Sequence, residues 1–319
     1  MKQAVYAGID VGGTFVKIGI VTKDGQILKE TQIPSEIEKP AKEMLKRAAE
    51  TIQNLIEEEG DCEIKGAGIG TAGSVNVDKG ILYEAPNMPN WKNEPFGEIL
   101  SNALGVPVIV DNDANVAAWG EYAYGAGRGS QYMMLVTLGT GVGGGLILDG
   151  KPYRGAIDAG GEFGHMSIDF DGWECGCGCK GCVEAYVGTK GILRQVREGL
   201  ESHPDSLLAK VDPNAIMPVD VSKAADQGDA LAIQVLRQTG EYLGYGLANA
   251  VNLLNIQRVV VGGGVAKAGD RILKPAFDTM KANAMRVLGE IVDLVPAELG
   301  NSAGLVGAAW LAAFTAGDV

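Results

Sequence analysis

Acidic and amide side chains stand at the end of one short apolar run of this sequence. Residues 107–110 read as a buried strand, Asp111, Asn112 and Asp113 follow it, and a helical run begins directly afterwards. Side chains at the carboxyl end of such a strand lie on the usual ligand side of an open α/β sheet. A carboxylate there can remove a proton from a bound hydroxyl, and a neighbouring amide can donate and accept hydrogen bonds. We therefore predict that Asp113 is a general base and that Asn112 binds the substrate, with helix capping as the alternative role.

Two glycine-rich turns could bind phosphate groups. Residues 10–17 read Asp-Val-Gly-Gly-Thr-Phe-Val-Lys, and residues 138–145 read Leu-Gly-Thr-Gly-Val-Gly-Gly-Gly. Both join two strand-like runs, so they are neither Walker loops nor Rossmann turns, which lead into a helix. One such turn could be an ordinary hairpin, but a pair favours loops whose backbone N–H groups converge on phosphate oxygens. The predicted phosphate-binding residues are Gly12, Gly13, Thr14 and Lys17 in the first turn and Gly139, Thr140 and Gly141 in the second.

A carboxylate just before the first glycine turn could hold a magnesium ion. Asp10 ends the first strand-like run and could bind Mg²⁺ directly or through water. The alternative is a turn-forming aspartate that accepts a hydrogen bond from the Gly12 N–H. Two opposed phosphate loops, a Mg²⁺ ion and a base near the acceptor form a complete set for phosphoryl transfer.

Four of the five cysteines fall between positions 175 and 182, close in sequence to His165, one of only two histidines. In a chain whose start shows no export signal, such a cluster indicates metal ligands rather than disulfides. Three cysteines and one histidine make a tetrahedral zinc site with no position open for water, so we predict a structural role. One cysteine is spare, and the alternative is a set of buried free thiols beside a core histidine. A zinc finger that binds nucleic acid is disfavoured, because the segment carries a single lysine and the chain is acidic.

Length and charge exclude several classes of protein. With 319 residues the chain is long enough for two core-bearing domains. No apolar run approaches the roughly 20 residues of a membrane span, and the first residues lead into a strand-like run without a secretory signal, so we expect a cytoplasmic protein. A formal net charge of −13 would repel nucleic acid and anionic lipid, and we expect neither as a partner.

The elements that must position these residues form a repeated pattern. Strand-like runs at 5–9, 16–21 and 27–33 give an antiparallel opening, and a helix at 40–59 follows. A second strand-turn-strand at 133–148 repeats the opening, which predicts duplicated α/β lobes with a ligand cleft between them. The other expected elements are strands at 66–71 and 259–261, helices at 230–254, 272–287 and 302–313, and a polar surface connection at 202–221.

The motifs together resemble those of the ROK family of bacterial sugar kinases and repressors, from Tyr6 to Ala313. The resemblance is carried by Asp10-Val11-Gly12-Gly13-Thr14, Asn112-Asp113-Ala114-Asn115, Leu138-Gly139-Thr140-Gly141, Glu162-Phe163-Gly164-His165 and the cysteine segment that ends in Glu184. It implies an α/β fold, the two-lobed actin-like, hexokinase-like ATPase fold of duplicated ribonuclease-H-like domains with a cleft between the lobes. We expect residues 1–115 plus 301–319 to form a smaller N-terminal lobe, onto which the final helix packs. Residues 116–300 would form a larger C-terminal lobe with a zinc-binding segment at 162–184.

The resemblance also implies roles for individual residues. Asp113 matches the catalytic base, and the residues that match contacts to sugar hydroxyls are Asn87, Asn112, Glu162, His165 and Glu184. The implied zinc ligands are His165, Cys175, Cys177 and Cys182, so that the metal would brace the sugar-binding segment. Cys179 stands where the family ordinarily has another residue, and it could compete as a ligand or be a reactive neighbour. Gly263 and Gly264 resemble the loop on the adenosine side of the nucleotide, with a simple strand-to-helix turn as the alternative.

Within the family the sequence looks most like the glucokinases of carbohydrate metabolism and glycolysis. This implies transfer of the γ-phosphate of ATP, with Mg²⁺, to O6 of glucose, and a homodimer or higher homo-oligomer. Fructose, mannose and N-acetylmannosamine are alternative acceptors, because kinases for these sugars share most of the motifs. A sugar-sensing regulator that does not bind DNA is the alternative of a different class. The family's repressors carry a helix-turn-helix before the first strand, and the first strand-like run here begins close to Met1.

Overall fold

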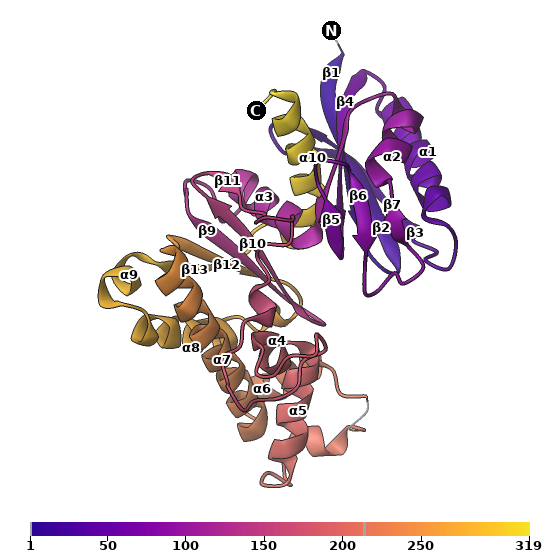
Figure 1. The fold of residues 1–319 in the computed structure, drawn as a ribbon. Coiled ribbons are helices and arrows are strands. Elements are labelled where there is room, and N and C mark those ends of the chain that lie inside the picture. Colours follow the sequence, from indigo (N-terminus) through magenta and orange to yellow (C-terminus); the bar gives the residue numbers. More distant parts are fainter. Residues whose placement is uncertain (1, 213–214) are drawn as a thin grey trace. The chain divides into compact units, whose positions relative to one another are not determined.

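Two units make up the chain in the computed structural model, which describes residues 2–212 and 215–319. The first unit contains Met1–Gln131, Gly145–Gly161 and Glu298–Val319. The second contains Tyr132–Gly144 and Glu162–Ala297. Each unit combines a sheet with helices, as the ribbon in Figure 1 shows.

The first unit is built on a five-stranded sheet of order β3-β2-β1-β4-β8. β1 (Gln3–Val11), β2 (Phe15–Thr22) and β3 (Ile27–Pro34) are antiparallel, whereas β4 (Cys62–Thr71) and β8 (Val108–Asn112) run parallel to β1. Valine, isoleucine, alanine and glycine occupy most of the buried positions of β1, β2 and β4, as expected for strands covered on both faces. The three parallel strands end at the same edge of the sheet, which is where Asp10, Asp111 and Asp113 lie.

Alternate residues of β1 face opposite sides of this sheet. Val5, Ala7 and Ile9 belong to a core shared with α1 (Ala41–Glu59) and α2 (Phe96–Leu104). Tyr6 belongs instead to a core with the last helix, α10 (Ala303–Ala316), on the other face. The unit is completed by α3 (Asp113–Tyr124) and by a small antiparallel sheet of β5 (Ser74–Asn76), β6 (Ile81–Glu84) and β7 (Lys92–Glu94).

Helix α10 lies directly on the backbone of the first sheet, beside β1 in Figure 1. A methyl group added at Gly8 of β1 would lie 2.0 Å from the carbonyl oxygen of Leu305, and one at Gly68 of β4 would lie 1.9 Å from that of Ala308. Only glycine permits such an approach of helix to strand. The predicted packing of the final helix on the first unit is therefore confirmed.

The second five-stranded sheet has the order β11-β10-β9-β12-β13. Its strands are β9 (Met133–Leu138), β10 (Val142–Leu148), β11 (Lys151–Pro152), β12 (Arg258–Gly262) and β13 (Asp293–Pro296). β12 is parallel to both β9 and β13, and β10 is antiparallel to β11. The strand order matches that of the first sheet, with β9 in the place of β1, and the three pair directions given above match as well, so the predicted α/β class and repeated layout are confirmed.

The helices of the second unit cover its part of this sheet. A short 3₁₀ turn, η1 (Phe163–His165), precedes the cysteine segment, and α4 (Val183–Val187) and α5 (Thr189–Leu200) follow it. The long α7 (Ala230–Leu254) packs along α8 (Asp270–Asn283) and also contacts α6 (Pro218–Asp226), while α9 (Arg286–Ile291) lies near the end of α8. Among the described residues, no helix has both the length and the apolar character needed to cross a membrane.

Several expected boundaries differ from the structure. The helix expected at 272–287 ends at Asn283, because Ala284 is extended, and α9 begins after it. The expected surface connection at 202–221 contains a 3₁₀ turn at Leu207–Lys210 and the start of α6, and residues 213–214 of it lie outside the described residues.

The expected lobe boundary after residue 115 falls inside α3. The structure keeps α3 in the first unit because it packs on α10, and the Glu121 carboxylate accepts hydrogen bonds from the N–H groups of Glu298 and Leu299. The first unit, rather than the second, thus contains the larger part of the chain.

Candidate active site

The junction between β8 and α3 gives Asn112 and Asp113 different roles. The Asn112 side-chain oxygen accepts hydrogen bonds from the N–H groups of Ala114 at 2.9 Å and Asn115 at 3.4 Å, which makes Asn112 the N-cap of α3. Its amide nitrogen donates to the carbonyl oxygen of Gly73 at 3.2 Å, and a hydrogen bond from the same side chain acts on the Asp113 carboxylate. The capping predicted for one of the two residues is confirmed, and it falls to Asn112.

Asp113 begins α3 with its side chain exposed to solvent. The protein around the carboxylate nevertheless raises the pKa of Asp113 above its ordinary value, because desolvation disfavours the charged form and outweighs the hydrogen bond at 2.9 Å from the Ala114 N–H. The group is thus open on one side and surrounded by protein on the others. A raised pKa makes a carboxylate a stronger base, and exposure lets a bound hydroxyl reach it.

Asp10 lies at the same edge of the sheet. The strand register pairs Asp10 with Gly70 and Gly70 with Asp111, so the two aspartates are two strands apart, about 10 Å between backbones. Burial raises the pKa of Asp10, the charge of Lys17 opposes this rise, and the charge of Asp113 adds to it. A divalent cation held by Asp10 would relieve this repulsion.

The hydrogen bonds of the first turn show that Asp10 does not have the turn-forming role. The Gly12 N–H donates to the carbonyl oxygen of Phe15 at 3.1 Å, so Asp10 is not the acceptor that the turn-forming alternative requires. Lys17 Nζ lies 4.0 Å from the Asp10 carboxylate and donates to the carbonyl oxygen of Asn301 at 2.9 Å, next to the start of α10. Asp10 is therefore left to bind a ligand on its open side.

The first glycine turn has its carbonyl groups occupied and amide groups available. Ser35 donates its hydroxyl to the Gly12 carbonyl at 2.6 Å and its N–H to the Thr14 carbonyl at 3.0 Å. In residues 2–212 and 215–319, the N–H groups of Gly13 and Thr14 find no acceptor. The predicted sugar contact Asn87 lies beside this turn, because a methyl group added at Gly13 would lie 3.4 Å from its amide nitrogen. The first unit therefore gathers Asp10, the turn, Asn87, Asn112 and Asp113 at one edge of its sheet.

The second glycine turn is held by the start of α5. Both the N–H and the hydroxyl of Thr189 donate to the carbonyl oxygen of Gly139, at 3.1 and 2.9 Å. The Gly139 N–H donates in turn to the Gly141 carbonyl at 2.9 Å, which closes the turn around the exposed Thr140. The dipole of α5 favours negative charge near this turn.

Glu184 contacts this second turn directly. Its carboxylate accepts a hydrogen bond from the Val142 N–H at 2.9 Å, and a methyl group at Gly141 would lie 2.4 Å from the same oxygen. The other carboxylate oxygen lies 3.7 Å from the Cys175 sulfur. Glu184 was predicted only as a sugar contact, and this link between the turn and the cysteines was missed, because nothing local in the sequence joins positions 142 and 184.

Gly263 and Gly264 follow β12 beside an apolar pocket. Gly263 has a φ of 93°, and a methyl group there would lie 2.2 Å from the carbonyl oxygen of Leu138, just before the second turn. Gly264 lines a pocket of about 360 Å³. The other lining residues are Ile192, Pro218, Val219, Ser222, Leu236, Val265 and Lys267. The pocket is mostly apolar, with the Ser222 hydroxyl and the Lys267 amino group as its polar side-chain groups. Such a pocket beside a glycine-rich turn suits the base of a nucleotide.

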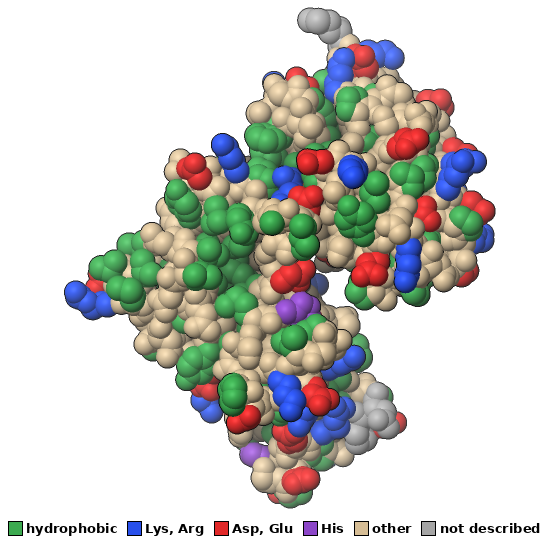
Figure 2. Space-filling view, in the orientation of Figure 1, with side chains coloured by type: hydrophobic (Ala, Val, Ile, Leu, Met, Phe, Trp, Pro, Cys, Tyr) green, Lys and Arg blue, Asp and Glu red, His purple; other side chains and the backbone are tan. Residues whose placement is uncertain are grey.

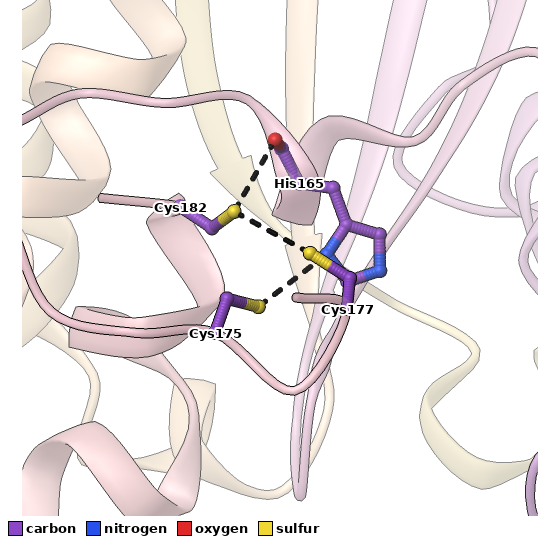
Figure 3. A group of neighbouring side chains, drawn as sticks. All are labelled: His165, Cys175, Cys177 and Cys182. Atoms are coloured by element: carbon purple, nitrogen blue, oxygen red, sulfur yellow. Dashed lines mark hydrogen bonds between the residues drawn. The ribbon is translucent and has the colours of Figure 1, made fainter. Parts of the chain in front are cut away.

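Three cysteines and one histidine point toward one another in the second unit, as Figure 3 shows. The His165 Nδ1 lies 3.7 Å from the Cys175 sulfur, the sulfurs of Cys177 and Cys182 are also 3.7 Å apart, and the four candidate ligand atoms all lie within 4.8 Å of one another. Ligands at about 2.3 Å from a tetrahedral zinc ion would be separated by about 3.8 Å. The cluster thus has the dimensions and the donor set of a structural zinc site.

The backbone around the cluster is closely packed. Gly181 has a φ of 69°, and a methyl group there would lie 1.8 Å from the carbonyl oxygen of Asp169. A backbone hydrogen bond at Cys179 lowers the pKa of the Cys177 thiol to about 7, which favours the thiolate that a metal binds. Cys179 itself is exposed and lies outside the group of four.

His165 connects the cysteine cluster with Glu162. Its Nδ1 faces the sulfurs, whereas its Nε2 lies 3.9 Å from a carboxylate oxygen of Glu162, and both side chains are exposed. A histidine held through one ring nitrogen has the other free to bind a substrate oxygen. The second unit therefore gathers Glu162, His165 and Glu184 around the cluster.

Arg154 forms an ion pair with the buried Asp111, which the sequence analysis did not predict. The guanidinium donates to one Asp111 oxygen from Nε at 2.8 Å, and its terminal nitrogen lies 2.7 Å from the same oxygen. Asp111 is 1% exposed. The two residues are 43 positions apart in the sequence, so no local pattern could have paired them.

Charges of both signs mix on the surface. In the view of Figure 2, lysine and arginine side chains of the described residues lie among aspartate and glutamate side chains rather than in one continuous patch.

Known proteins resemble this chain over nearly its whole length. The ROK family model matches residues 6–314. A glucokinase from Halalkalibacterium halodurans is 37% identical over 98% of this chain and 96% of its own length. The crystal structure of a ROK family glucokinase from Streptomyces griseus in complex with glucose and AMPPNP has a TM-score of 0.78 and 35% identity, covering 97% of this chain and 99% of that one. A xylose repressor from Bacillus subtilis is 30% identical over 96% of this chain and 76% of its own length.

Proposed function

This chain belongs to the ROK family, and we propose that it transfers the γ-phosphate of ATP to O6 of glucose, with Asp113 as the general base. It is an ATP-dependent sugar kinase with the hexokinase-like ATPase fold of this family. The β8–α3 junction carries the assignment of the base. Asn112 supplies the helix cap, so the exposed Asp113 carboxylate is free to take the proton of the attacking hydroxyl.

The phosphate and base contacts of ATP are assigned to the glycine segments of both units. The unpaired N–H groups of Gly13 and Thr14 support phosphate binding by the first turn, and the helix start at Thr189 supports it for Gly139–Gly141. The pocket beside Gly264 would take the adenine base. Asp10 would hold Mg²⁺, which neutralises phosphate charge during transfer.

The sugar hydroxyls are assigned to Asn87, Asn112, Glu162, His165 and Glu184. The cluster of His165, Cys175, Cys177 and Cys182 would hold a structural zinc ion that fixes the orientation of the His165 ring. Glucose is the favoured substrate because glucokinases match the chain over nearly its full length. Fructose, mannose and N-acetylmannosamine are the alternative acceptors.

Steady-state kinetics with ATP and Mg²⁺ test the proposal. We expect glucose-dependent release of ADP with formation of glucose 6-phosphate, and a higher kcat/KM for glucose than for the other three sugars. Asp113→Asn keeps an acceptor for the Ala114 N–H, and it should lower kcat by about 10²- to 10⁴-fold because the proton acceptor is lost. A variant as active as the wild-type protein would contradict the role of Asp113, and absence of glucose-dependent ADP would contradict the substrate.

A sugar-sensing role is the second candidate, favoured by the similarity to a xylose repressor. Calorimetry distinguishes the two, because a sensor would bind glucose without turning it over in the presence of ATP. The homodimer or larger homo-oligomer and the cytoplasmic location stay predictions. Analytical ultracentrifugation would establish the first.

A further inference from the structure

We infer that Arg154 is a positioning residue for Asp113: its guanidinium holds and neutralises Asp111, the buried carboxylate that clamps the backbone on both sides of Asp113. The inference rests on the proposed role of Asp113 as the base. Arg154 follows β11 in the first unit and lies in the same unit as the β8–α3 junction.

Asp111 ties the end of β8 to the first turn of α3. One of its carboxylate oxygens accepts the Asn112 N–H at 2.8 Å and the Asn115 side-chain amide at 3.0 Å. These two donors belong to the residues one before and two after Asp113. Asn115 is only 4% exposed, so its side chain has little freedom to leave the pair. The clamp therefore fixes the backbone from which the Asp113 carboxylate projects.

Arg154 completes the set of partners of Asp111. The second carboxylate oxygen receives two guanidinium nitrogens, at 2.8 and 2.7 Å, so both oxygens are fully used. A carboxylate that is 1% exposed keeps its charge only when an opposite charge and hydrogen bonds compensate for lost water. Without Arg154 this compensation is lost, and Asp111 would turn away from its amide partners.

The segment that carries Arg154 is itself held in place. The Gly160 N–H donates to the Arg154 carbonyl at 2.7 Å, and the Asp158 carboxylate accepts the Val77 N–H at 3.0 Å. The guanidinium is therefore presented to Asp111 from an ordered loop. Such support is what distinguishes a positioning residue from a chance surface ion pair.

The pair also places two opposite charges near Asp113, because Asp111 lies two residues before it. The titratable and charged groups of the first unit near Asp113 are Asp111 at the end of β8, Asp10 on β1, Lys17 on β2 and Arg154 on the loop after β11. Helix α10, which packs on α3, carries no charged residue between Ala303 and Ala316. Removal of Arg154 would leave an uncompensated negative charge near the base, whereas removal of the Asp111 charge would leave a positive one.

Four variants test the inference through the pH dependence of kcat/KM. Arg154→Met should lower kcat about 10- to 100-fold, because the base is misplaced. It should also move the acid limb of the profile, the pH range in which activity falls because the base becomes protonated, up by about 0.5 to 1 pH unit. Asp111→Asn keeps an acceptor for Asn112 and Asn115 and should move the limb down by a similar amount. The double variant, with neither charge, should return the limb near its wild-type position, and Arg154→Lys should keep the limb and lose little kcat.

The acid limb should move in opposite directions in Arg154→Met and Asp111→Asn, which a merely structural role of the ion pair would not produce. Arg258→Met is the matched control, since it breaks the Arg258–Asp293 ion pair of the second unit, and it should leave the limb unmoved. If Arg154→Met does not fold, two variants still test the inference. The acid limb should move down in Asp111→Asn and should stay in place in Arg154→Lys. An unmoved limb in folded Arg154→Met and Asp111→Asn overturns the inference.

A direct titration keeps the two proposals distinguishable. The Asp113 carboxyl carbon, assigned in ¹³C-aspartate-labelled protein by its absence in Asp113→Asn, should titrate higher in Arg154→Met and lower in Asp111→Asn. This holds even if the chain phosphorylates none of the sugars tested, an outcome that would contradict the proposed function alone. Equal titration of Asp113 in all variants would overturn the role of Arg154 alone.

Discussion

Asp10 and Asp113 occupy surroundings that disfavour their own charges. Burial raises the pKa of both carboxylates, and the charge of Asp113 adds to the rise at Asp10. A carboxyl group with a raised pKa in the folded state stabilises the fold while it is protonated, and this contribution is lost as pH rises through that pKa. At neutral pH the ionised pair therefore opposes folding, as expected of groups that serve catalysis rather than stability.

Removal of either charge should therefore stabilise the protein at neutral pH. Asp10→Asn and Asp113→Asn are expected to raise Tm at pH 7.5, and the difference from the wild-type protein should shrink as pH falls toward the ordinary pKa of aspartate. Scanning calorimetry across this range measures the effect. Asp293→Asn is a control that breaks an ion pair with Arg258 instead and should not raise Tm. A lower Tm of Asp113→Asn at pH 7.5 would contradict the raised pKa.

Glu184 offers a second test at the scale of one side chain. Glu184→Gln keeps an acceptor for the Val142 N–H, so the KM for ATP should change by less than about threefold. Glu184→Ala leaves that N–H without its partner and should raise the KM for ATP about tenfold. Equal KM values for ATP in both variants would show that Glu184 does not support the second turn.

Sequence reasoning proposed site residues whose position in the fold can be predicted from their neighbours along the chain. Asp113 and Asn112 were predictable because a strand end and a helix start meet there, and both turns were predictable from their glycines. Arg154 was not, because its partner lies on another strand and an isolated arginine in a loop is an ordinary surface residue. The contact depends on how the segment after β11 packs on the β8–α3 junction, which the sequence does not encode locally.

At the scale of elements, the segment from His165 to Cys182 contains no regular helix or strand among its described residues after η1. Its backbone contains short bridges, Ser167 with Cys182 and Glu174 with Lys180, in place of regular strands. Short irregular segments of this kind bury little apolar surface and usually need a metal or disulfides to hold one conformation. The same segment leads into α4, which carries Glu184.

Removal of zinc should therefore loosen this segment. We expect about one zinc ion per chain by inductively coupled plasma mass spectrometry, and a Tm lowered by about 5 °C or more after chelation. Cys182→Ser should lose the metal because Cys182 is one of the four grouped ligands. Cys179→Ser is the matched control from the same segment, and it should retain the metal. Loss of zinc in Cys179→Ser would instead make Cys179 a ligand.

Helix α10 supplies the sharpest element-scale prediction. Gly68→Ala forces a methyl group to 1.9 Å from the Ala308 carbonyl oxygen and should lower the free energy of unfolding by about 1–3 kcal/mol or more. Gly66→Ala, on the same strand, meets nothing closer than 3.5 Å and should cost far less. Urea unfolding of the two variants gives the comparison. Equal stabilities would mean that α10 does not rest on β4.

At the scale of the whole molecule, the sequence predicted the repeated sheets better than it predicted the boundary between the two lobes. The two glycine turns sit in equivalent hairpins, which made the duplication of the sheets readable. The division after residue 115 was misplaced because α3 follows β8 without a break, and only its packing on α10 assigns it to the first unit. The short strands β5, β6, β7 and β13 were also missed, because three or four residues are too few for a visible alternation.

The place of α10 in the chain has a consequence for biosynthesis. The first sheet is synthesised within the first 112 residues, yet the helix that covers one of its faces begins at Ala303. At 5 to 20 residues per second, the ribosome needs about ten to forty seconds to make the intervening chain. During that time the face formed by Tyr6, Gly8 and Gly68 lacks its helix, and the emerging protein offers chaperones an apolar sheet surface. The first unit contains the earliest strands of the chain, yet it can finish folding only after the last residues have been made.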